Sequence, residues 1–163
     1  MNMPAVRFVF LRDAAELYGA EGLAYATPGS VGLDLRACFE PAEGETTPPG
    51  EVTVPAGGRL RVPAGVAIEP LSPGIAGFIF SRSGLGAVRG LTVAQGVGVI
   101  DPDYRGERAV VLLNTSGTPL CLRRGERVAQ LVFMPALRVC PERAETLSDT
   151  TRGTGGFGHT GAL

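Results

Sequence analysis

The sequence is poor in the residues that build metal and disulfide sites. Its 163 residues include three cysteines, one histidine and no tryptophan. Cys38, Cys121 and Cys140 are widely spaced and form no C-x-x-C pair. With a single histidine and widely spaced cysteines, the usual ligand set of a zinc site is missing, so we expect no such site. We therefore expect reduced and partly buried thiols.

Excess charge and long hydrophobic runs are also missing. The formal net charge is −1, so nothing attracts nucleic acid or an anionic membrane by bulk charge, and any anion site must be local. No apolar run approaches the ~18 residues that a membrane span needs. Arg7, Arg12 and Asp13 interrupt the apolar N-terminal patch, unlike a secretory signal. We expect a cytoplasmic protein that binds neither nucleic acid nor membrane.

Glycine and proline, by contrast, are abundant and occur along the whole chain, with 24 and 13 residues. They break helices and separate short β-prone runs, which predicts an all-β sandwich or barrel. We expect one helical stretch at residues 12–21, and a short helix or an irregular segment at 141–150. Residues 40–58 read as an exposed loop or long hairpin. The expected strands are 6–11, 51–54, 59–62, 65–69, 77–80, 91–93, 109–114 and 127–133.

Two interior segments carry groups that suit a nucleotide. FSRSGLGAVRG places Arg82, Ser83 and Gly84 in one turn, where they form either a phosphate site or an ordinary Ser-Gly turn. GVGVIDPDYRGE places Asp101 after a β-like run, with Tyr104 three residues on. An acid at a strand end beside an aromatic ring could orient a water and a sugar. The alternative is a type I turn with Asp and Pro in its first two positions.

Three further segments hold polar groups in unusual settings. Gln130 lies inside the apolar run VAQLVF, so its amide needs a structural or ligand partner. Asp34 lies between two leucines, on a solvent face or in a polar site. The tail RGTGGFGHTGAL contains a G-x-G-x-x-G pattern ending at Gly158, but only five residues follow it, and a dinucleotide fingerprint must open a helix. We expect instead a flexible, anion-binding arm.

These stretches, taken together and in order, resemble the five motifs of the trimeric dUTPase family, in its bacterial branch. The motifs are PGSVGLDLRA, RSGLG, GVIDPDYRGE, GERVAQLVF and RGTGGFGHTG, and the resemblance spans residues 24–161. It implies a distorted jelly-roll or barrel of the β-clip type, assembled as a homotrimer. Residues 1–149 would form the β domain. Residues 150–163 would form an exchanged arm that closes over a neighbouring subunit's active site and lacks order without ligand.

The resemblance also implies what the chain does. It would hydrolyse dUTP to dUMP and pyrophosphate by water attack on the α-phosphorus, with Mg²⁺ on the triphosphate. The reaction would limit uracil incorporation into DNA and supply dUMP for dTTP synthesis. Two alternatives remain at this point: a relative of dCTP deaminase, and a nucleotide-binding regulator on the same fold.

Individual residues take roles from the resemblance. Asp101 would orient and deprotonate the attacking water, and Tyr104 would pack on the deoxyribose and reject ribonucleotides. Asp34 would lie near the metal without binding it directly. Gln95 stands where many relatives have asparagine, so we expect the longer amide to change the pyrimidine contact. The remaining expected substrate contacts are Arg82, Ser83, Gly84 and Gln130 for the phosphates, Gly98, Val99 and Ile100 for the uracil edge, and Arg152, Phe157, Gly158, His159 and Thr160 from the arm.

Overall fold

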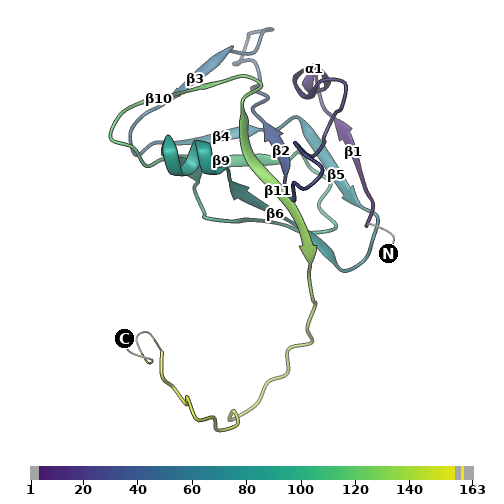
Figure 1. The fold of residues 1–163 in the computed structure, drawn as a ribbon, viewed down its shortest axis with the longest axis vertical. Coiled ribbons are helices and arrows are strands. Elements are labelled where there is room, and N and C mark those ends of the chain that lie inside the picture. The colour runs from purple at the N-terminus through teal and green to yellow at the C-terminus, as the bar shows by residue number, and fades with distance from the viewer. Residues whose placement is uncertain (1–3, 157–158, 160–163) are drawn as a thin grey trace.

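The structure, a computed structural model, describes residues 4–156 and 159 and shows an all-β fold built from short antiparallel strands (Figure 1). The expected fold class is thereby confirmed. The elements are β1 (Val6–Phe10), α1 (Ala14–Tyr18), β2 (Leu33–Arg36), β3 (Glu51–Val54), β4 (Arg59–Pro63), β5 (Val66–Pro70), β6 (Ile75–Ser81), the π-helical turn η1 (Gly84–Val88), β7 (Leu91–Val93), β8 (Gly98–Ile100), β9 (Ala109–Asn114), β10 (Leu120–Arg123) and β11 (Arg127–Pro135).

The strands form four small sheets around one core. Their orders are β1-β5, β10-β3, β2-β11-β6-β8 and β4-β9-β7. Alternation along the strands supplies the core: β9 has the pattern intermediate, buried, intermediate, buried, with Val110 and Leu112 facing inward. Leu35, Leu122 and Leu131 bring β2, β10 and β11 into the same apolar cluster. Fully burying one such leucine stabilises the fold by roughly 1.5–3 kcal/mol.

All of the expected strands are present, and the structure adds three more, β2, β8 and β10. β10 was missed because TPLCLR is short and directly precedes a turn, and its partner is β3. The Ser-Gly turn expected after β6 is a π-helical turn, in which the Gly86 N–H donates to the Arg82 carbonyl oxygen at 2.7 Å. The single expected helix is confirmed as α1, and residues 141–150 are irregular.

The chain leaves the sheets after β11. The Ala136 N–H still donates to the Gly74 carbonyl oxygen at 2.9 Å, and the segment beyond it then runs away from the body (Figure 1). Residues 137–156 form no helix or strand, and Leu137, Val139 and Leu147 are almost fully exposed. The expected boundary between residues 149 and 150 stays a prediction. Within the described part of the chain, no helix is long and apolar enough to cross a membrane.

Candidate functional site

A hollow of about 370 Å³ lies where β8 ends, and it holds the two residues expected to carry the chemistry. Asp101 follows β8 directly, and the Tyr104 N–H donates to the Asp101 carbonyl oxygen at 3.1 Å, which closes the expected turn. The Asp101 side chain is exposed and pairs with no other group in the described residues. The hollow is lined by Arg61, Val99, Ile100, Asp101, Tyr104, Ala109 and Val111.

β8 forms the edge of its sheet in the described chain, since it pairs only with β6. Its other side therefore offers backbone N–H and C=O groups that a ligand can use. Gly98 fits this position because a Cβ there would lie 3.2 Å from Ile79 and 3.4 Å from the Gln95 amide nitrogen. The Gln95 side chain thus lies against Gly98, the first residue of β8, which precedes Val99 and Ile100.

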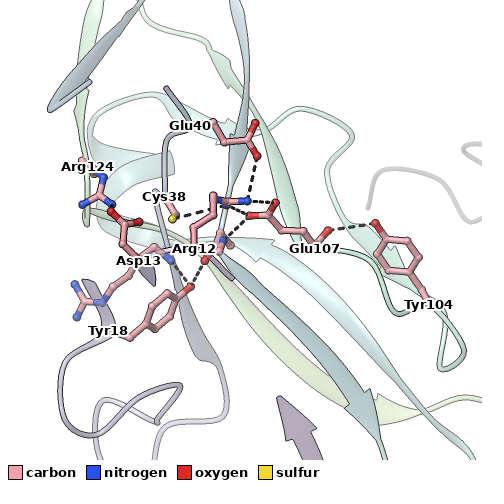
Figure 2. Close-up of polar contacts among 11 residues, drawn as sticks. Arg12, Asp13, Tyr18, Cys38, Glu40, Tyr104, Glu107 and Arg124 are labelled. Carbon is pink, nitrogen blue, oxygen red and sulfur yellow. Dashed lines mark hydrogen bonds and ion pairs between the residues drawn. The ribbon is translucent and has the colours of Figure 1, made fainter. Parts of the chain in front are cut away.

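The loop that carries Tyr104 is fixed to the body by Glu107 (Figure 2). The Arg12 guanidinium donates to both Glu107 carboxylate oxygens, with the Nη1 to Oε2 distance at 3.0 Å, and also pairs with Glu40. The Gly65 N–H donates to Glu107 Oε1 at 2.7 Å. The Tyr104 hydroxyl in turn donates to the Glu107 backbone oxygen at 3.2 Å. The network therefore ties the Tyr104 loop to two other parts of the chain.

Glu107 remains charged in this network. Burial alone would raise the pKa of its carboxyl, but the hydrogen bonds from Arg12 and the Gly65 N–H outweigh burial and hold that pKa below its usual range. The Arg12 pKa is raised, chiefly by its hydrogen bond to Glu107. Arg12 holds this contact from a left-handed backbone conformation, with φ at 55°. Such a conformation is uncommon for a residue other than glycine.

A second polar cluster lies where β2, β6 and β11 meet. Asp34 Oδ1 accepts a hydrogen bond from Arg82 Nε at 2.9 Å, and Asp34 Oδ2 accepts one from Arg127 Nη1 at 3.1 Å. Gln130 is opposite Asp34 in the β11–β2 register, so both side chains lie on one face. Gly32 gives the Gln130 side chain room, since a Cβ there would lie 3.0 Å from Gln130 Cβ.

Asp34 therefore resides in a polar site, which resolves the alternative left open by the sequence. Its carboxylate is largely buried, with 10% of the side chain exposed, and it forms ion pairs with two arginines. Ser83 and Gly84 follow Arg82 and are exposed at the start of η1. We call Asp34, Arg82 and Arg127 the Arg82 cluster. Because Ser83 and Gly84 come directly after Arg82, their backbone groups and the Ser83 hydroxyl lie beside this cluster.

The two polar sites do not meet within one chain. Ile100, the residue before Asp101, is opposite Gly77 in the β6–β8 register. Arg82 follows the other end of β6, five residues beyond Gly77. At about 3.3 Å per residue, the two sites are about 17 Å apart along the strand. A triphosphate would have to reach from one to the other.

The arm residues are described only in part. Arg152 Nε donates to the Gly155 carbonyl oxygen at 2.8 Å, and the His159 N–H donates to the Gly156 carbonyl oxygen at 3.2 Å. These are local turns. The roles expected for Phe157, Gly158 and Thr160 fall outside the described residues.

Two arginines near these sites were not singled out from the sequence. Arg61 lines the Asp101 hollow from β4, and Arg127 shares Asp34 with Arg82. The alternation in RLRV predicts that Arg61 points away from the core, on the opposite face of the strand from Val62. It does not predict which residues Arg61 lies beside. Arg127 begins β11 beside the turn at Gly125, and only the pairing with β2 brings it to Asp34. Neither contact is encoded in local spacing.

The comparisons with known proteins agree with one another. The family model described as dUTPase matches residues 20–161. Deoxyuridine 5'-triphosphate nucleotidohydrolase from Desulfitobacterium hafniense (strain DSM 10664 / DCB-2) is 43% identical over 137 residues, covering 84% of this chain and 85% of the relative. The protein from Pseudomonas putida (strain W619) with the same name is 44% identical over 138 residues, covering 85% of each.

Solved structures show the same likeness. The dUTPase from Streptococcus mutans is 29% identical with a TM-score of 0.64, covering 82% of this chain and 98% of that one. A variant dUTPase from phage phi11 of S. aureus, whose structure shows a coordinated structural Mg(II) ion, has a TM-score of 0.70 at 16% identity, covering 89% and 99%. At that identity the second likeness concerns the fold alone. From its sequence matches and its fold, the chain belongs to the dUTPase family.

Proposed function

We propose that this chain is a cytoplasmic dUTP diphosphatase that hydrolyses dUTP to dUMP and pyrophosphate by water attack on the α-phosphorus. Besides family membership, one observation carries the proposal: a carboxylate that pairs with none of the described residues and a tyrosine ring lie in one hollow beside the open edge of a strand. The reaction limits uracil incorporation into DNA and supplies dUMP for dTTP synthesis.

The hollow suits a deoxyuridine. The open edge of β8 presents the backbone donors and acceptors of alternate residues in Gly98–Ile100, which can pair with the edge of uracil as a neighbouring strand would. The Gln95 amide lies close enough to add a contact. The Tyr104 ring forms an apolar surface on which the sugar packs, and a ribose 2′-hydroxyl would collide with it. Asp101 then holds and deprotonates the attacking water.

The Arg82 cluster suits the phosphates. A guanidinium has five N–H donors, and Arg82 gives Asp34 only its Nε–H. Asp34 orients Arg82 and Arg127, leaving donors of both free for phosphate oxygens. Ser83, Gly84 and Gln130 add a hydroxyl, a backbone N–H and an amide. Phosphoryl transfer depends mainly on such positioning and charge neutralisation.

We infer that a complete site forms only between chains. The separation of the Asp101 hollow from the Arg82 cluster supports a homotrimer in which one chain supplies the uridine pocket and the next supplies phosphate contacts. The segment that leads to the arm supports the same arrangement, because Leu137, Val139 and Leu147 find no cover among the described residues of their own chain. The third chain would contribute Arg152, Phe157, Gly158, His159 and Thr160.

Mg²⁺ fits this site as an ion carried by the triphosphate. Asp34 is engaged by two arginines, so its carboxylate is poorly placed to bind a metal directly and would act through water. No group of three or more His, Cys, Asp or Glu side chains gathers within residues 4–156 and 159. When bound, the metal would neutralise phosphate charge and help orient the leaving pyrophosphate.

The proposal predicts strong substrate selectivity. With Mg²⁺, pyrophosphate release should be fast for dUTP and at least about 100-fold slower for UTP, dCTP and dTTP, since the hollow excludes a 2′-hydroxyl and the strand edge reads uracil. The measurement is kcat/KM for each nucleotide under one set of conditions. Comparable values for dUTP and UTP would contradict the role of Tyr104, and no turnover of dUTP would contradict the function.

A further inference from the structure

Arg108 is a buried cation without an acidic partner in the described chain. It follows Glu107 and directly precedes β9, and only 1% of it is exposed. None of the described carboxylates forms an ion pair with it, and burial lowers its pKa. A buried charge that lacks a counter-charge opposes folding unless hydrogen bonds compensate it. Its presence therefore indicates a task that an apolar residue could not perform.

The guanidinium holds three backbone carbonyl oxygens. Arg108 Nη1 donates to Gly106 at 2.7 Å, and Nη2 donates to Ile68 at 2.8 Å and to Tyr104 at 3.0 Å. Two of these acceptors belong to the loop after Asp101, and the third belongs to β5. Arg108 therefore joins the Tyr104 loop to a strand of a different sheet.

The same guanidinium also contacts the Tyr104 ring. Arg108 Cζ lies 4.7 Å from the ring centroid, within the range of a cation–π contact. Gly106 makes this possible, because a Cβ there would come within 2.3 Å of the Tyr104 hydroxyl oxygen. The hydroxyl itself is held by the Glu107 backbone oxygen. The Tyr104 ring is thus fixed along one side, while about half of the surface of Tyr104 stays exposed to solvent.

We propose that Arg108 is a positioning residue that fixes the Tyr104 ring and thereby sets the enzyme's selectivity for deoxyribose over ribose. The inference rests on the proposed function, in which Tyr104 packs on the sugar. Arg108 acts through Tyr104 and does not touch the nucleotide, since it is buried. A planar guanidinium is needed because it can stack on a ring while donating to three acceptors. A lysine ammonium can satisfy some of these carbonyls but presents no plane to the ring.

The test compares kcat and KM for dUTP and UTP in the full-length enzyme. Arg108→Lys keeps the buried charge and should fold. Its dUTP-over-UTP ratio of kcat/KM should fall about tenfold, the factor expected when one charge-assisted hydrogen bond is lost. Arg108→Met should lose more. The change in kcat/KM should come mainly from KM and not from kcat, because Asp101 remains in place. Arg59→Met, at an exposed position on β4, is the control and should keep the wild-type ratio.

A second pair of variants separates positioning from a general structural role. In a Tyr104→Leu background, Arg108→Lys should cause no further loss of selectivity, since its effect passes through the ring. Wild-type selectivity in Arg108→Lys, or independent losses in the double variant, would overturn the inference. Wild-type enzyme that hydrolyses both nucleotides alike, or neither, would instead refute the proposed function.

Discussion

Replacing Asp101 by asparagine should lower kcat for dUTP by about 10³-fold, within the range typical of a lost general base. The substitution keeps the size of the side chain and its place after β8, but a neutral amide cannot take a proton from water. Asp101 is exposed and outside the hydrophobic core, so the fold should be unaffected. Nucleotide affinity should stay close to that of the wild type, because the strand edge, Tyr104 and the arginines remain.

The measurement is single-turnover hydrolysis together with the equilibrium affinity for a non-hydrolysable dUTP analogue. Asp103→Asn provides a matched control, since Asp103 is exposed in the same turn but has no assigned role. It should keep nearly full activity. Turnover of Asp101→Asn within tenfold of wild type would remove Asp101 from its role as the base.

Deleting the residues after Asp149 should lower kcat/KM for dUTP by about 10²- to 10³-fold. The arm is expected to bring Arg152, His159 and Thr160 to the phosphates and Phe157 to the base, and loss of even one well-placed donor has an effect of this size. The hydrogen bonds of the described residues after Asp149 stay within the arm, so the deletion breaks none to the sheets.

Stability and assembly serve as controls for the truncated chain. Its thermal midpoint should lie within about 2 °C of the intact protein, because a deletion that exposes no core surface changes the unfolding free energy by less than about 1 kcal/mol. Its mass in solution should still be that of a trimer. A truncated enzyme with full activity would contradict the role of the arm.

Much of the fold follows from local patterns. The short β-prone runs AVVLLN and RVAQLVF predict β9 and β11, and glycine at 125 marks the turn before β11, where its φ is 80°. Local patterns do not predict which strands pair with one another. Nothing in LCLR indicates that β10 pairs with β3, far away in the sequence, and propensity alone does not indicate a π-helical turn after Ser83.

In the candidate site, too, local sequence predicts some contacts, and others depend on which strands pair. Asp101, Tyr104 and the strand before them are adjacent in sequence, so their motif predicts one hollow, and the structure places them together. The contact of Asp34 with Arg82 and Arg127 depends on β11 lying between β2 and β6. The buried charge of Arg108 was not foreseen either, because an arginine after RGE reads as a surface residue until the packing of β5 is known.

The sharing of one active site between chains is the central claim of this account. It can be tested with the two inactive variants described above. Asp101→Asn chains carry intact arms, and chains ending at Asp149 carry intact Asp101. Neither variant alone supplies both parts of a site.

Co-expressed with different affinity tags and purified through both, the two variants form mixed trimers. The account predicts that dUTP hydrolysis reappears, at about a third of the wild-type rate, because in either kind of mixed trimer one site of the three takes Asp101 from one chain and an arm from another. Mixed trimers no more active than either variant alone would contradict it, since Asp101 and the arm would then have to come from the same chain.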